Sequence, residues 1–104
     1  MSETQTSVDV RTLPGGAILN VRTRHSEYRL EVCDGPQAIV TVCGGSFFPQ
    51  ETVTRLNGST ARGGSIKVGS VQIGLRVEFE NSSSRVLTSP VTAFEVVEPL
   101  PHVA

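Results

Sequence analysis

The sequence predicts an all-β protein, a small antiparallel barrel of six or seven short strands with no substantial helix. Two observations support this class. Short runs rich in β-branched residues are separated by turn residues about every 8–12 positions, as in small sandwiches and barrels. No window repeats apolar residues at helical spacing over three turns, and glycine or proline interrupts almost every candidate helix. Bent strands in so short a chain favour a barrel over a flat sandwich.

The length of the chain predicts one domain. Residues 1–12 are mostly polar, and we expect them to form a flexible N-terminal tail. Residues 13–98 are expected to form a single β-barrel domain with an SH3-like or similar fold, and residues 99–104 a C-terminal tail. The oligomeric state and the order of the strands do not follow from the sequence.

The first half of the domain reads as three strands. After a turn at residues 13–16, residues 17–23 form the first. Residues 26–33 alternate cleanly, with Tyr28, Leu30 and Val32 on one face, which is typical of a half-buried antiparallel strand. A turn at residues 34–36 leads into a returning strand at residues 38–43.

This hairpin separates the two cysteines. Cys33 lies at its turn end and Cys43 at its open end, opposite Glu27 or Tyr28. At about 3.3 Å per residue the two are roughly 15–20 Å apart, whereas a disulfide needs Cα atoms within about 7 Å. The sequence therefore predicts two free thiols and no metal pair.

The stretch from residue 44 to residue 65 carries two Gly-Gly-Ser triplets, which indicate turns. Asn57-Gly58 is typical of a hairpin tip, here between strands at residues 52–56 and 59–62. The adjacent Phe47 and Phe48 point to opposite faces of a strand, so one of them is a candidate for exposure.

The clearest strand covers residues 70–80. Its inward face is predicted to carry five apolar residues: Val71, Ile73, Leu75, Val77 and Phe79. Gly74 in its middle indicates a bend where a sheet turns a corner. A turn at residues 81–84, a return at residues 85–89 and a last strand at residues 91–98 follow, and Pro90 indicates an edge or a switch between sheets.

The sequence carries no recognisable catalytic or cofactor motif. There is no phosphate-binding or dinucleotide-binding glycine pattern. His25-Ser26 lacks a third orienting group, His102 falls in the predicted tail, and the cysteines do not supply a metal-ligand spacing. We therefore expect a protein that is not an enzyme and that has no cofactor and no metal.

The N-terminus has no signal-peptide pattern, and no apolar run is long enough to span a membrane. The formal net charge of −1 gives no overall attraction to nucleic acid or anionic lipid. These features predict a cytoplasmic protein of bacterial type with no membrane partner.

The distribution of charge suggests a binding surface. Residues 52–77 contain four basic residues and no acid. Together with the two phenylalanines they give the candidate ligand-binding set: Phe47, Phe48, Arg55, Arg62, Lys67 and Arg76. An exposed Phe beside arginines could stack on bases. Glu78 and Glu80, on the same strand face as Arg76, oppose that reading.

Two functions follow as hypotheses. The first is a non-catalytic binding module for nucleic acid or another anionic partner. The second is a protein–protein interaction or regulatory domain that docks partners through an exposed strand edge and Phe47 or Phe48.

Overall fold

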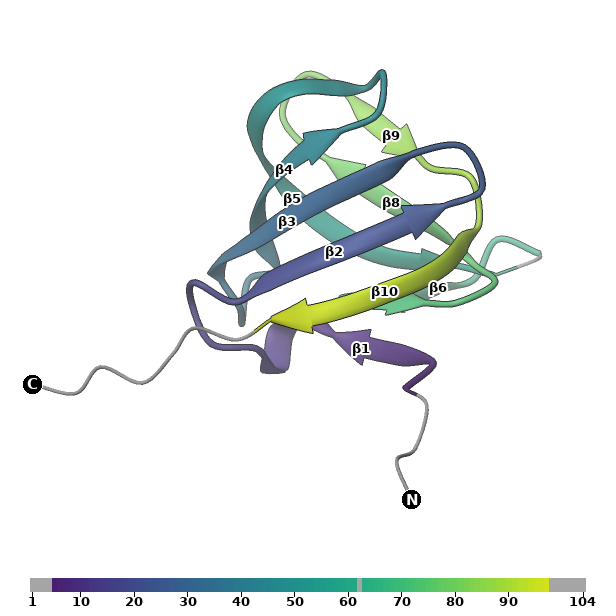
Figure 1. Cartoon of the computed structure of the whole chain (residues 1–104), viewed down its shortest axis with the longest axis horizontal. Helices are drawn as coiled ribbons and strands as arrows, with labels where there is room; N and C mark the ends of the chain where they lie inside the picture. Colours follow the sequence, from purple (N-terminus) through teal and green to yellow (C-terminus); the bar gives the residue numbers. More distant parts are fainter. Residues whose placement is uncertain (1–4, 62, 98–104) are drawn as a thin grey trace, which may run out of the picture.

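The computed structural model describes residues 5–61 and 63–97. These residues form two antiparallel sheets and a single turn of 3-10 helix, which confirms the all-β prediction (Figure 1). The elements are β1 (Ser7–Asp9), the 3-10 helix η1 (Val10–Thr12), β2 (Ile18–Thr23), β3 (Glu27–Asp34), β4 (Ile39–Gly44), β5 (Phe48–Thr60), β6 (Ile66–Val68), β7 (Ser70–Gln72), β8 (Arg76–Glu80), β9 (Arg85–Leu87) and β10 (Val91–Val97).

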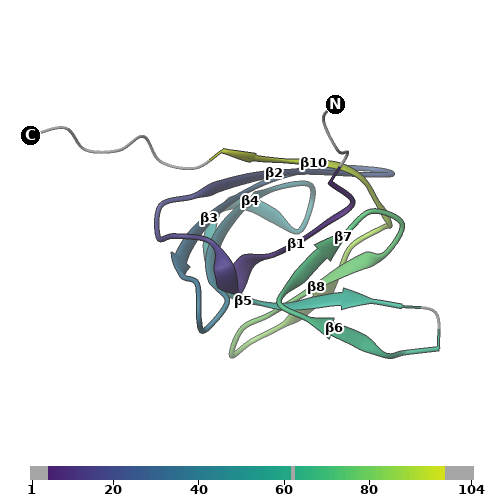
Figure 2. The ribbon, with the colours of Figure 1, turned by 90° about the horizontal axis from the view of Figure 1, so that it is seen from below.

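The larger sheet has the strand order β10-β2-β3-β4-β5-β8-β9, and β6 pairs with the far end of β5. The smaller sheet joins β1 to β7. Figure 2 shows how the larger sheet curls, so that β1 and β7 lie on its concave side. The core fills this concave side and is built from the alternating positions of the strands.

The first hairpin follows its prediction closely. Tyr28, Leu30 and Val32 are buried on β3, and they face Val40 and Val42 of β4. Cys43 lies opposite Arg29, one position from the predicted partner. Cys33 and Cys43 are both free thiols, as predicted.

The prediction of a hairpin tip at Asn57-Gly58 is wrong. β5 runs through these residues, and the chain reverses only between Ala61 and Ser65, where the Ala61 N–H donates to the Ser65 carbonyl over 2.8 Å. Asn57 instead marks a bulge in the pairing of β5 with β8. Gly58 has a φ of +141°, a value that suits glycine in a bulged strand. Since β6 and β8 pair with opposite edges of this segment, the ladder overrides the local turn preference.

The predicted long strand at residues 70–80 is divided into β7 and β8. Gly74 lies in a turn between them, which agrees with the predicted corner. Val71, Val77 and Phe79 are buried, whereas Ile73 and Leu75 are only partly buried. The predicted inward face is therefore confirmed at Val71, Val77 and Phe79. Ile73 packs against the core from the turn, and the prediction is wrong at Leu75, which does not.

Residues 7–12, which the sequence assigns to a tail, are ordered. β1 pairs with β7, and Val8 and Val10 belong to the core. Val10 has no exposed surface, and its N–H donates to the Gly69 carbonyl over 2.9 Å. The predicted C-terminal tail lies outside the described residues.

The strand ladder of the larger sheet is open in the described residues, with β9 and β10 at its two ends. The segment that joins β9 to β10 forms backbone hydrogen bonds to β8 and to the turn before it. The Thr88 N–H donates to the Val77 carbonyl, and the Val91 N–H donates to the Leu75 carbonyl. In the ranges 5–61 and 63–97, no helix has the length and apolarity needed to cross a membrane.

Candidate functional site

The two phenylalanines are separated by the turn between β4 and β5. Phe48 is 4% exposed and packs edge-to-face against Phe79, with ring centroids 5.3 Å apart. Phe47, in the turn itself, is 55% exposed. Phe48 is thus a core residue, and Phe47 alone could contact a partner.

The predicted basic residues do not share one surface with Phe47. Arg55 lies seven positions after Phe48 along β5, which is about 23 Å in an extended strand. Arg76 lies opposite Thr60, at the other end of the ladder from Arg55, and Lys67 lies on β6. Arg62 lies outside the described residues.

Arg55 instead lines a groove of about 560 Å³ that the fold assembles from distant segments. One wall comes from η1 and the β3–β4 turn, another from β6, and the remainder from β5, β8 and the start of β9. Its charged, amide and exposed aliphatic lining residues are Arg11, Arg55, Asn57, Ile66, Val68, Glu78, Glu80 and Arg85. We call this surface the docking groove.

The charged residues of the docking groove form a row across three strands. Glu80 of β8 lies opposite Arg55 of β5 on one side and opposite Arg85 of β9 on the other. The Asn57 side-chain amide donates to Glu80 Oε1 over 2.9 Å and to Glu78 Oε2 over 2.8 Å. Both carboxylates are thereby held by a neutral donor.

The ion pairs between described residues are Arg11–Asp9 and Arg22–Glu27. Arg55 and Arg85 therefore line the groove without an ion pair to any described carboxylate. Their guanidinium groups retain donors for a carboxylate from elsewhere. The adjacent Glu78 and Glu80 keep the groove close to neutral overall.

Apolar side chains lie beside these charges. Ile66 is 39% exposed and Val68 is 56% exposed, and both belong to β6 and line the groove. The buried Ala38 and Leu56 lie behind them at the same surface. The groove therefore combines exposed aliphatic surface with two arginines that carry no ion pair.

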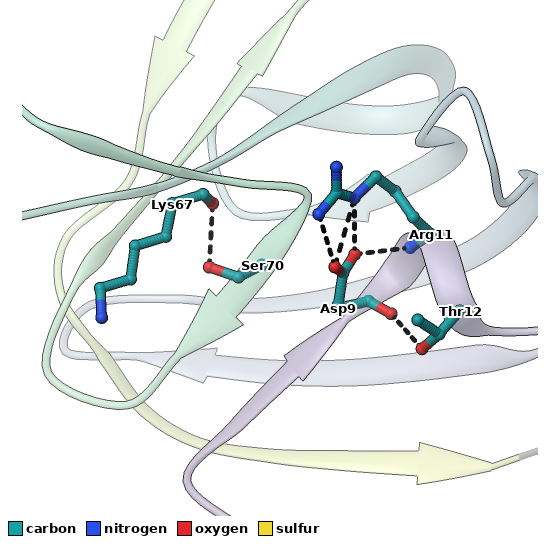
Figure 3. A network of polar contacts seen from close by, with 5 residues as sticks. All are labelled: Asp9, Arg11, Thr12, Lys67 and Ser70. Atoms are coloured by element: carbon teal, nitrogen blue, oxygen red, sulfur yellow. Dashed lines mark hydrogen bonds and ion pairs between the residues drawn. The ribbon is translucent and has the colours of Figure 1, made fainter.

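The wall formed by η1 is fixed by a local ion pair (Figure 3). The Asp9 carboxylate accepts from the Arg11 backbone N–H over 2.9 Å and from its Nη2 over 2.7 Å. Gly69 packs against this pair: a Cβ there would lie 2.7 Å from Arg11 Nε, and its φ of +71° also favours glycine. The hydrogen bonds from Arg11 lower the pKa of the Asp9 carboxyl below its ordinary value.

This pair predicts a pH-dependent contribution to stability. Because the folded-state pKa of Asp9 is depressed, its contribution is present above the unfolded pKa of about 4 and is lost as pH falls through the lower folded value. Asp9→Asn should therefore unfold at lower urea than wild type at neutral pH, with the gap closing as the solution becomes more acidic. A gap that persists unchanged in acid would show that the charge of Asp9 contributes nothing.

Two groove residues, Arg11 and Arg85, were missed by sequence reasoning. Neither falls in the acid-free segment at residues 52–77. Arg11 begins a second acid-free segment, residues 11–26, but the sequence assigns it to the N-terminal tail. The non-local pairing of β1 with β7 brings Arg11 to the groove, and the local hairpin of β8 and β9 brings Arg85 there. Elsewhere in the described ranges, no cluster of three or more His, Cys, Asp and Glu side chains is arranged to hold a metal ion.

No protein-family model matches the chain, and comparisons with curated proteins and with solved structures also found no match.

Proposed function

We propose that the protein is a non-catalytic protein–protein interaction module, and that its docking groove binds an extended polypeptide segment carrying a carboxylate next to an apolar side chain. The observation that carries this proposal is the joint presence of Arg55, Arg85, Ile66 and Val68 in one groove. The aliphatic pair would bury the apolar side chain of the partner, and the arginines would take its carboxylate in charge-assisted hydrogen bonds.

The geometry favours a polypeptide over nucleic acid, the other hypothesis from the sequence. Glu78 and Glu80 lie among the groove arginines and would repel a phosphate backbone. Phe47 lies in the turn before β5, eight residues from Arg55, and Phe48 is buried, so no aromatic platform for bases lines the groove beside the cations. Exposed apolar side chains rimmed by polar residues are instead typical of protein-interaction sites.

The experiment is a selection from a phage library of random peptides of about 12 residues, with the protein as bait. Selected peptides are expected to carry Asp or Glu near a large apolar residue. Their affinity should fall by about tenfold or more for Arg55→Ala/Arg85→Ala, because the peptide carboxylate loses its two charged partners. Arg24→Ala/Arg29→Ala is the matched control, since it removes two exposed arginines outside the groove.

A labelled single-stranded oligonucleotide is titrated in parallel at low salt. No binding at micromolar protein is expected. Salt-sensitive binding that is lost in the Arg55→Ala/Arg85→Ala variant would overturn the polypeptide proposal in favour of nucleic acid. Equal peptide affinity for the two double variants would show that the groove is not the docking site.

We also propose that the curved sheet forms a small, partly open barrel that is joined at one end through residues 88–91. The hydrogen bonds of Thr88 and Val91 to the region of β8 support this arrangement, as does the continuity of this segment into β10, which pairs with β2. The placement in the cytoplasm and the single domain remain predictions from the sequence.

A further inference from the structure

β10 ends the larger sheet and is its least protected edge. It pairs with β2 on one side, and no strand of the described ranges pairs with its other side (Figure 1). β1, which lies nearby in Figure 1, pairs with β7 instead. The open edge therefore extends over most of the seven residues of β10.

The backbone groups on this open edge can be assigned from the alternation of an antiparallel ladder. Beyond the ends of the β2–β3 ladder, the Thr23 N–H donates to the Ser26 carbonyl and the Val32 N–H to the Ala17 carbonyl. The odd-numbered residues of β2 therefore direct their N–H and C=O groups toward β3, and the even-numbered residues direct theirs toward β10. Asn20 is one of the even-numbered residues, and it lies opposite Glu95. The neighbours of Glu95, Phe94 and Val96, then direct theirs outward.

β10 carries fewer features that discourage pairing than the other edges of the sheet: a bulge between Val91 and Ala93, near its start, and one charge. β9 and β6 are three residues long, and they carry Arg85 and Lys67 respectively. β10 is seven residues long, has no proline or lysine, and carries Glu95 as its one charge. Its Val97 is 45% exposed. A strand edge of this kind is a template for another strand.

We infer that this edge pairs with β10 of a second copy of the chain, antiparallel and across a two-fold axis. The charge of Glu95 excludes one register and is compatible with the one that we infer. Centring the pair on Glu95 would place two carboxylates opposite each other, whereas centring it on Phe94 places each Glu95 opposite Ala93 of the second copy. In that register Phe94 lies opposite Phe94 of the second copy. The outward N–H and C=O groups of the two residues then form a pair of hydrogen bonds with each other.

A single strand pair buries less surface than a stable dimer interface, so the dimer should be weak, with a dissociation constant of about 10–100 µM. The inference does not rest on the docking groove, since none of the groove residues belongs to β10.

The experiment is sedimentation velocity from about 5 to 500 µM protein, a range that brackets the expected dissociation constant. Wild type should shift from monomer to dimer. Ala93→Glu should raise the dissociation constant by about tenfold, because it opposes Glu95 of the second copy twice, and Ala93→Lys should lower it. Within one chain, position 93 lies opposite Arg22, so Ala93→Glu should stabilise the fold and Ala93→Lys should destabilise it. A general loss of stability therefore cannot mimic this pattern.

Leu87→Glu is the control, because Leu87 on the β9 edge is 42% exposed and gains the same charge. It should leave the dissociation constant unchanged. Wild type that remains monomeric at the highest concentration would overturn the inference. So would a dimer that Leu87→Glu disrupts and that both Ala93 variants leave intact.

Discussion

Leu30→Ala is expected to lower the free energy of unfolding by about 2–5 kcal/mol, a large part of the total for a small domain. Leu30 has no exposed surface and lies between Leu19 of β2 and Val42 of β4, in the middle of the larger sheet. Truncation would remove buried apolar surface and leave a cavity that a tightly paired sheet cannot close. Urea unfolding followed by circular dichroism measures the change.

Two leucines provide the comparison for this prediction. Leu75 is partly buried in the turn before β8, so Leu75→Ala should cost clearly less than Leu30→Ala. Leu87 is exposed, and its replacement should change stability by no more than about 0.5 kcal/mol. If Leu75→Ala lowered the free energy of unfolding as much as Leu30→Ala, Leu75 would belong to the core. That result would contradict the division of residues 70–80 into two strands.

Gly58→Ala is expected to cost about 2–4 kcal/mol, through backbone strain and overpacking together. A Cβ at this position would lie 2.1 Å from the Lys67 carbonyl oxygen, which belongs to the backbone of β6 and cannot move independently. The substitution would therefore separate β6 from β5 and carry Ile66 and Val68 away from the groove. Hydrogen exchange at the amides of β6 measures the separation alongside the loss of stability.

Gly74→Ala separates strain from steric overlap. Gly74 also has a positive φ, +94°, but a Cβ there would meet nothing within 4 Å. It should cost about 1 kcal/mol from strain alone and leave β6 protected. If Gly58→Ala were no worse than Gly74→Ala, β5 would not pass as close to β6 as described.

The sequence predicts the parts of this fold that depend on local patterns. The alternation of Tyr28, Leu30 and Val32 identifies a buried strand face, and the adjacent turn places Cys33 and Cys43 apart. Asn57-Gly58 misleads, because its local preference for a turn is weaker than pairing on both edges of β5. Val8 and Val10 are too few to show a periodic pattern, so the pairing of β1 with β7 could not be predicted.

The candidate site depends even more on non-local contacts. Of the groove arginines, only Arg55 belongs to the predicted ligand-binding set. Arg11 begins a second acid-free segment, residues 11–26, but falls in the predicted N-terminal tail. Arg11 reaches the groove only through the distant pairing of β1 with β7, whereas Arg85 follows from the local β8–β9 hairpin. The exposure of Ile66 and Val68 follows from the position of β6 beside the far end of β5, which the sequence does not specify.

The most direct test of the docking groove is a titration of ¹⁵N-labelled protein with one library-selected peptide, followed by amide chemical shifts. We expect the largest shifts at Arg55, Asn57, Ile66, Val68 and Arg85, with little change at Phe47 or along β10. Shifts concentrated at residues 45–47 or on β10, with the groove amides unmoved, would contradict the assignment of the groove as the docking site.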